Sequence, residues 1–449
     1  MSSTTTPKQN QIGLGLAVAI GLASMLGAGI FVVFHEADAL TSKVSDHWAL
    51  LIAIALAALV ASLNAASVYQ LASAVSRAGG VYAYSRVYVG PTTSFIAGFS
   101  FIFGKIGSIA AIGLVFGVYV WPEQPVLTAC LAIAALTTIN LLGINRTAKV
   151  ALVLAISTVA FLLVTIIWGF AHGVEALPAG VVIAPDDTLS HSVDYFVSFV
   201  GNGGLMPILS AASLIFFAFA GYARVATLGD EVRNPKRNIP QAIVIALGAV
   251  VLLYFAIAVM FQNTLGSGLS TSQAPFVTFW QNSTISLGWS PDVTQKVVVI
   301  FAAAASLGSL LALLAGVSRT AATMAEDREL PTWFSARNRH GAPWLAEVLV
   351  AVGAVVLAQF GRLDWVIGFS SLSVLAYYFI GHVAVLRQLK IEKPGRKAHA
   401  VRSATAWLGL ALCAVLLLAV PGPALWLSTL ILAAALFVRR VARPRRDPS

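Results

Sequence analysis

Charged residues are scarce in this sequence. Only 10% of its 449 residues are Asp, Glu, Lys or Arg, whereas 58% are hydrophobic. A soluble globular protein carries about 25% charged residues, so the composition indicates an integral membrane protein. Cysteine is rarer still: Cys130 and Cys413 both lie in apolar runs. We therefore expect two unpaired thiols in the core or against lipid rather than a disulfide.

The residue clusters that catalysis requires are also missing. A membrane enzyme would need paired carboxylates or a His/Cys/Asp metal cluster at membrane depth, and neither can be placed there. We therefore expect no enzymatic activity, no catalytic residues and no metal site. The G-x-G of Gly27 and Gly29 is no dinucleotide fingerprint, because the strand–helix context and the later glycine are absent. We expect no cofactor.

A clear cleavable signal is lacking as well. The polar start, MSSTTTPKQNQ, holds a single basic residue, Lys8, and is followed by no clear small-residue cleavage site. We therefore predict that the first apolar run is retained as a membrane helix.

Long apolar runs, by contrast, occur along the whole chain. Crossing a hydrocarbon core of ~30 Å takes about 20 mostly apolar residues. On that rule the sequence predicts an all-α integral membrane protein with 12 transmembrane helices near 12–34, 48–72, 94–120, 125–142, 149–171, 205–225, 240–262, 293–323, 344–360, 364–386, 404–420 and 424–438.

The basic residues predict the orientation. With the N-terminus in the cytoplasm, nearly all of the 28 Lys and Arg lie in or beside cytoplasmic segments, and only Lys43, Lys105, Lys296 and Arg362 do not. This is the positive-inside asymmetry, and it predicts a multi-pass protein of the cell membrane with both termini cytoplasmic. The basic residues behind the net charge of +10 are spread along that face of the lipid bilayer and are not interleaved with aromatic side chains. Nucleic acid is therefore not expected as a partner.

Two apolar segments are interrupted by glycine. Gly27 and Gly29 lie inside Leu22–Phe31, and Gly221 lies where the apolar start of Phe216–Ala242 turns charged and proline-rich. A break inside a bilayer leaves backbone groups unpaired, which is tolerated only where protein, water or ligand satisfies them. Paired interrupted segments are a pointer to a transporter binding site.

Lys105 lies in the middle of the third predicted span. A lysine at that depth is costly and is expected to face the bundle interior with a function, since snorkelling from there is difficult. No Asp or Glu can be placed in mid-span; Glu347 and Asp364 come closest, at helix ends, and His382 lies toward the inner end of its span. Lys105 is therefore our ion-coupling candidate: it could carry a proton, or stay charged and hydrogen-bond to carbonyls of the interrupted helices.

Four motifs, in order along the chain, resemble the amino acid–polyamine–organocation (APC) transporters. ASMLGAGIF at 23–31 is similar to their first helix, and the segment 77–91, with RAGGVY and YVGP, to the loop after their second. FFAFAGY…DEVRNPKRNIP at 216–240 resembles their sixth helix and inner loop. SR…MAED…LP at 318–331 is similar to the end of their eighth helix.

The resemblance implies a five-plus-five inverted-repeat fold of the LeuT type with two appended helices. It divides the chain into a cytoplasmic tail at 1–11, a first repeat at 12–171, a second repeat at 205–386, the appended helices at 404–438 and a basic cytoplasmic tail at 439–449.

The resemblance also implies a substrate site at the two interruptions. Exposed amides at a helix start suit a carboxylate, and exposed carbonyls suit an ammonium. By motif position the carboxylate is expected at Ser24, Gly27, Ala28 and Gly29, and the amine at Phe217, Ala218 and Gly221. Phe217 falls where the family places an aromatic gate, while the alternative for it and its neighbours is packing in the core or against lipid.

The sequence departs from the family pattern at two places. In the family, a Glu usually follows G-F in the sixth helix, but here the run reads Gly221-Tyr222-Ala223-Arg224. Many members of the family also carry a lysine in the fifth helix, and Phe161 occupies that position here. The fifth-helix lysine, whose charge usually takes the place of a bound cation, is thus missing, while Lys105 is present in the third span.

We therefore expect a secondary active transporter that moves a neutral amino acid or related amine by alternating access, with proton-coupled symport as the expected mode. An amino acid exchanger on the same fold, and a membrane nutrient sensor with the same site, are the alternatives.

Overall fold

The computed structural model describes residues 12–42, 48–75, 77, 79–142, 144–172, 204–226, 232–272, 274–359, 363–420 and 422–442. Throughout these residues the fold is helical, with one isolated β-bridge between Ile12 and Val232. The helices are α1 Leu14–Met25, α2 Ala28–Thr41, α3 Ala49–Ala74, α4 Val81–Tyr88, α5 Pro91–Val120, α6 Pro125–Leu141, α7 Ile144–His172, α9 Leu205–Phe219, α10 Ala223–Ala226, α11 Pro235–Leu265, α12 Pro275–Thr284, α13 Pro291–Glu326, α14 Trp344–Ala358, α15 Leu363–Glu392, α16 Arg396–Ala419 and α17 Gly422–Ala442.

Within the described part of the chain, nine helical stretches are long and apolar enough to cross a membrane, and three shorter apolar helices lie at Pro125–Leu141, Trp344–Ala358 and Ser428–Phe437. The fold is therefore that of a multi-pass membrane protein. The count of 12 crossings, the inverted repeat and the domain boundaries stay predictions. The predicted tail at 1–11 and most of the tail at 439–449 lie outside the described residues.

Several helix starts follow directly from the sequence. The helices α5, α6, α11, α12 and α13 each begin with proline, whose fixed φ suits the first helical position and whose missing N–H costs nothing there. Before α4 the chain turns at Gly79 and Gly80, with φ of 110° and 57°. These are conformations that side chains with a Cβ rarely adopt, which explains the paired glycines of the RAGGVY motif.

Some boundaries differ from the predicted ones. The first span continues through α2 to Thr41 rather than ending near residue 34, so Glu36 and Asp38 belong to its last turns. The last-but-one span, α16, begins at Arg396 rather than 404. Hydropathy misses both extensions because polar residues near a helix end lower the local average while leaving the backbone hydrogen bonds intact.

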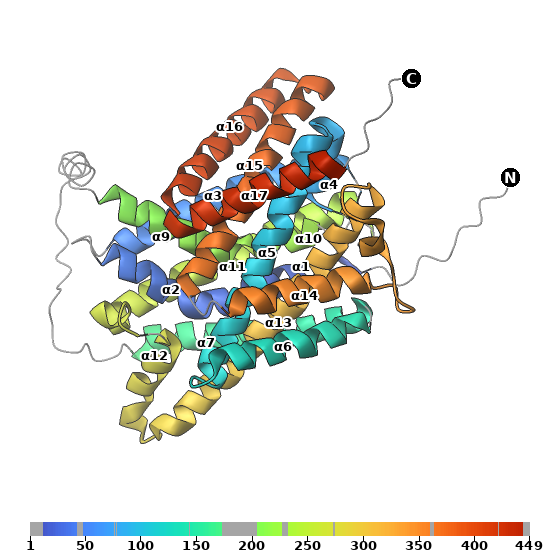
Figure 1. The fold of residues 1–449 in the computed structure, drawn as a ribbon. Coiled ribbons are helices and arrows are strands. Elements are labelled where there is room, and N and C mark those ends of the chain that lie inside the picture. The colour runs from blue at the N-terminus through green and yellow to red at the C-terminus, as the bar shows by residue number, and fades with distance from the viewer. Residues whose placement is uncertain are drawn as a thin grey trace, which may run out of the picture.

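Both predicted interruptions are present. The helix α1 ends at Met25 and α2 begins at Ala28, with Leu26 and Gly27 between them. The helix α9 ends at Phe219 and passes through a 3₁₀ turn, η1 Ala220–Tyr222, into α10. In Figure 1, α2 and α9 lie toward one end of the bundle and α1 and α10 toward the other, so the interruptions fall between the two ends.

The helix α5 runs beside the interrupted pair and packs against α15, α13, α6 and α14 (Figure 1). Its glycines allow this close packing: a Cβ at Gly104 or Gly107 would press on Ser373 or Phe369 of α15. The outer surface carries large apolar side chains, among them Ile167, Leu418 and Trp426 at 66%, 74% and 77% exposure. Such a surface is suited to lipid. Cys130 and Cys413 are both free thiols, as expected.

Candidate functional site

The two interruptions touch each other through their glycines. A Cβ at Gly221 would collide with the backbone carbonyl of Ser24, and a Cβ at Gly27 would collide with the side chain of Ser309 on α13. Gly29 lies against Ala218, whose Cβ would be 3.1 Å from an added methyl group. Gly221 and Gly27 are therefore required by a close approach between backbones or helices, and a side chain at Gly29 would need Ala218 to shift.

One small cavity lies at this junction. Six of the seven predicted binding residues line it together with Lys105, and the structure adds Met25, Ser108, Ile112, Ser309 and Leu313. The seventh, Ala28, supplies the first helical residue of α2. Ser108 and Ser309 could have been suspected as hydroxyls within apolar spans, but Met25, Ile112 and Leu313 carry no signal that separates them from core residues.

The cavity is closed around very little space. Its volume is about 10 Å³, which is room for about one water molecule. An amino acid does not fit in this space, so the residues that line the cavity must move apart before one can bind.

Backbone groups at the interruptions face one another. The first turn of α2 begins at Ala28, and the first N–H groups of a helix have no intrahelical partner. On the other side, the N–H of Ala220 bonds to the carbonyls of Phe216 and Phe217 at the end of α9. The carbonyls of Ala218 and Ala220 accept hydrogen bonds from the side chains of Tyr254 and Lys105. The site thus presents donors on one wall and acceptors on the other.

Protein side chains satisfy several of these carbonyls. The Tyr254 hydroxyl of α11 donates to the carbonyl oxygens of Met25 at 2.7 Å and Ala218 at 3.3 Å, which links the two interruptions. The Ser309 hydroxyl donates to the Ser24 carbonyl at 3.4 Å. The Ser24 hydroxyl itself donates to Ile20 within its own helix at 2.7 Å, so in this conformation its proton is directed away from a carboxylate.

Lys105 is buried, with 2% exposure. Its Nζ donates to the carbonyl oxygen of Ala220, the first residue of η1, at 2.9 Å. Among the described residues that line the cavity around it, none carries a carboxylate. The lysine therefore interacts with the interrupted backbone rather than with an acidic side chain.

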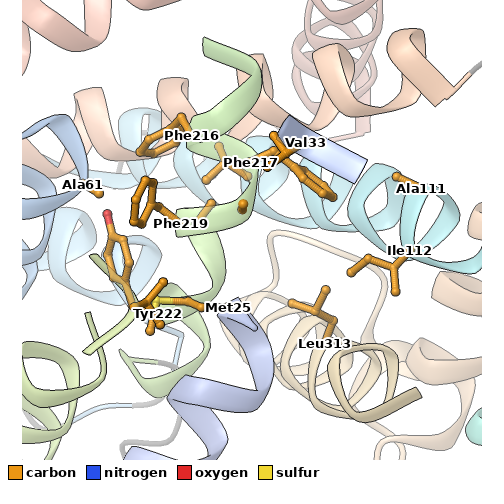
Figure 2. Packing of buried hydrophobic residues seen from close by; sticks show 14 of the residues in the cluster. Met25, Val33, Ala61, Ala111, Ile112, Phe216, Phe217, Phe219, Tyr222 and Leu313 are labelled. Carbon is orange, nitrogen blue, oxygen red and sulfur yellow. The ribbon is translucent and has the colours of Figure 1, made fainter. Parts of the chain in front are cut away.

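The phenylalanines of α9 divide between two environments. Phe217 lines the cavity, whereas Phe216 is fully buried and packs edge-on against Tyr378 at 6.0 Å between ring centroids. Figure 2 shows Phe216, Phe219 and Tyr222 on the side of α9 toward Ala61, with Ile112 and Leu313 across the junction. Phe161, at the position of the usual lysine, stacks on Phe301 at 4.7 Å.

Two charged side chains lie deeper in the structure than the sequence suggested. Arg224 is 2% exposed, and its Nε donates to the carbonyl oxygen of Ala312 at 2.8 Å. Glu347, near the start of α14, is also 2% exposed and interacts electrostatically with Arg319 and Arg224 and through a hydrogen bond with Asn140. The position of Glu347 at a helix end was predicted, but its burial among other helices could not be read from hydropathy.

A cluster of ion pairs closes the end of the bundle that holds α4. Asp327, just after α13, accepts from Arg77 at 2.6 Å and from the Tyr82 hydroxyl at 2.8 Å. Glu329 accepts from Arg86 of α4 and Arg439 of α17, each at 2.8 Å, and its side chain is fully buried. Arg439 also lies 4.7 Å above the Phe95 ring of α5. This end cluster connects α4, α5, α13 and α17.

Comparisons with known proteins agree with this architecture. A family model described as amino acid permease matches residues 12–438. An uncharacterized transporter of Mycobacterium bovis is 39% identical over 416 residues, which cover 92% of this chain and 87% of that protein.

Relatives with named substrates are more distant. The cationic amino acid transporter 7 of Arabidopsis thaliana is 25% identical over 83% of this chain and 64% of its own length. The branched-chain amino acid permease of Bacillus subtilis is 24% identical over 84% of this chain and 80% of its own length. The protein is therefore a multi-pass membrane transporter and not an enzyme. It belongs to the amino acid permease family of the APC superfamily.

Proposed function

We propose that this protein is a secondary active transporter of a neutral amino acid or a closely related amine, working by alternating access. The observation that carries this proposal is the meeting of two interrupted helices around one cavity, whose lining within the described part of the chain includes no carboxylate. A zwitterion matches the donor and acceptor walls, whereas the second positive charge of a cationic substrate would have no partner there.

The proposed binding mode follows from helix geometry. The substrate carboxylate lies at the first turn of α2, where the N–H groups and the helix dipole favour an anion. The ammonium lies at the carbonyls between Phe217 and Gly221, and the substrate side chain extends toward Ile112 and Leu313, with Phe217 as the gate. The apolar lining favours an aliphatic side chain, which agrees in kind with the branched-chain substrates named for the Bacillus subtilis relative.

Lys105 is the proposed proton carrier, which makes the transporter a proton-coupled symporter. Its Nζ bonds to the same turn, η1, that the substrate must reach. A change in the charge of Lys105 would therefore alter the hydrogen bonding of that turn. The competing mode of transport is amino acid exchange on the same fold. The competing role for Lys105 is a static one, in which it stays protonated and only holds η1 in place.

Binding and transport can be tested separately. A thermal-shift screen of the purified protein against the amino acids identifies the ligand, because a ligand that binds the folded state raises its apparent stability. Counterflow in liposomes then distinguishes a transporter from a nutrient sensor, since a sensor binds the ligand but moves none. Neutral amino acids are expected to shift the melting temperature, and stabilisation by arginine or lysine alone would contradict the assignment.

Accumulation against a gradient tests the coupling. With an imposed inward proton gradient, symport predicts net uptake into liposomes that contain no amino acid. Exchange predicts uptake only when the liposomes are preloaded.

A further inference from the structure

A second and larger hollow lies away from the substrate cavity. This crevice, about 620 Å³ in volume, is bounded by α3, α4, α15 and α16 and shares no lining residue with the cavity at the interruptions. Its volume is that of a typical small-molecule site, about 300–1,000 Å³. The lining residues that carry polar groups are Ser67, Tyr69, Gln70, Ser73, Tyr88, Gln388, Glu392, Arg402 and Thr405.

One wall of the crevice is a hydrogen-bonded network that fixes a carboxylate. The Gln70 amide donates to Gln388 at 2.9 Å, and Gln388, which is 1% exposed, donates to Glu392 Oε1 at 3.0 Å. The Tyr88 hydroxyl donates to the same oxygen at 2.9 Å. Burial and this bond to Glu392 raise the pKa of Tyr88 to about 12, so the phenol stays a donor at neutral pH.

The carboxylate of Glu392 has capacity left for a ligand. Both of its described hydrogen bonds end on Oε1, and Oε2 accepts none from the residues that the structure describes. Because Glu392 is held from two helices, its free oxygen occupies a defined position on the crevice wall. Such an oxygen suits a donor with several N–H groups, of which a primary ammonium is the simplest.

The opposite charge stands on another wall. Arg402 of α16 lines the crevice and is exposed, and no ion pair joins it to Glu392 within the described chain. The two charges therefore face one crevice without neutralising each other. A ligand that carries an ammonium and an anionic oxygen acid would match them, and a guanidinium binds phosphate oxygens through paired N–H groups.

The crevice lies where a phospholipid headgroup would be. It sits at the end of α3, the end of α15 and the start of α16, beside the basic segment that holds Lys390, Lys393, Arg396 and Lys397. Along α16 the surface next to it is apolar, with Val401 67%, Trp407 58% and Leu408 48% exposed. Apolar surface meeting a basic rim marks the boundary between hydrocarbon and headgroups.

We propose that this crevice binds the headgroup of a phosphoethanolamine lipid, with its ammonium on Glu392, its phosphate on Arg402 and its acyl chains along α3 and α16. A choline headgroup has no N–H to donate to Glu392, and a glycerol headgroup has no ammonium. The site is independent of the substrate cavity, so this proposal does not depend on which amino acid is transported.

The test is native mass spectrometry of delipidated full-length protein titrated with phosphatidylethanolamine, phosphatidylcholine and phosphatidylglycerol of the same acyl chains. Phosphatidylethanolamine is expected to bind at least ~10-fold more tightly than phosphatidylcholine. Glu392→Gln is expected to remove that preference while leaving phosphatidylglycerol binding unchanged. Arg402→Gln is expected to weaken both phosphatidylethanolamine and phosphatidylglycerol.

Controls decide between specific and general binding. Lys397→Gln removes one charge from the same basic segment but lies outside the crevice lining, and it is expected to leave the headgroup preference intact. Equal binding of the ethanolamine and choline lipids, or a Glu392→Gln protein that still discriminates between them, would overturn the proposal. The same titration is repeated with free phosphoethanolamine. If it binds as tightly as the lipid, the ligand is a soluble molecule and the lipid assignment is wrong. Because Arg402 is exposed, its variant tests the site even if Glu392→Gln impairs folding.

Discussion

The Nζ of Lys105 lies 2.9 Å from the carbonyl oxygen of Ala220. The only charged side chain of α5 is therefore hydrogen-bonded to η1, the turn that follows α9. The same turn contacts the first interruption, since Gly221 lies directly against the Ser24 carbonyl. A change at Lys105 can thus be transmitted through one hydrogen bond to both interrupted helices.

The first prediction concerns this lysine. Lys105→Met removes the charge but keeps much of the aliphatic stem. If Lys105 carries the coupled proton, the variant loses pH-driven accumulation in liposomes and keeps substrate exchange. Loss of binding and exchange together with accumulation would instead identify Lys105 as a fixed support of η1. Proton-driven accumulation at the wild-type level would exclude both roles.

The second prediction concerns the close contact at Gly221. Gly221→Ala and the larger Gly221→Leu place a Cβ on the Ser24 carbonyl, and overpacking costs about 1–3 kcal/mol. Uptake is expected to be abolished by the leucine variant while membrane insertion continues, and the same holds for Gly27→Leu. Gly15→Ala in α1 is the matched control, because no atom of the described residues lies within 4 Å of its added Cβ. Normal uptake with Gly221→Leu would remove the basis for the site.

The third prediction separates the two neighbouring phenylalanines. Phe217→Ala is expected to weaken substrate binding by about 10-fold or more in a thermal-shift titration, because Phe217 lines the cavity. Phe216→Ala is expected to act mainly on stability, since truncating a buried phenylalanine costs about 3–5 kcal/mol. Equal losses of substrate affinity in the two variants would mean that Phe217 is a packing residue and not a gate.

The fourth prediction concerns the hydroxyl that links the interruptions. Tyr254→Phe leaves the carbonyls of Met25 and Ala218 without this donor, and an unsatisfied buried acceptor costs about 1–3 kcal/mol. Reduced melting temperature and slower uptake are expected. Tyr84→Phe is the matched control, because the Tyr84 hydroxyl is also buried but donates a longer hydrogen bond, at 3.5 Å, to the carbonyl oxygen of Ala226. If both variants behave alike, the bridging bonds contribute nothing.

The fifth prediction concerns the end cluster. Glu329→Gln leaves Arg86 and Arg439 facing a neutral side chain, and removing one partner of a buried ion pair costs about 3–5 kcal/mol. The pair Glu326–Arg337 is exposed, at 47% and 53%, so Glu326→Gln is expected to change stability by at most about 1 kcal/mol. Thermal unfolding in detergent compares the two variants, and the expectation fails if their shifts are equal.

The backbone interruptions could be predicted from sequence because they depend on local chemistry. Glycine inside an apolar run lowers the cost of leaving the helix, and the motifs around Gly27 and Gly221 placed both breaks in order along the chain. Six predicted binding residues and Lys105 consequently line one cavity. The first span's extension to Thr41 was missed, because a helix tolerates polar residues in its last turns.

By itself, the sequence determined the membrane class, the positions of the apolar spans and the two interruptions, since apolar run length and glycine placement act within a single segment. Only the tertiary structure decided that Lys105 meets Ala220, that Tyr254 links Met25 to Ala218, and that Ile112 and Leu313 share the cavity. Within a bilayer, helices are apolar on most faces, so hydropathy does not show which side of α5, α11 or α13 points inward. That choice comes from close packing between small residues and from backbone groups that need partners, and both arise only when distant helices are brought together.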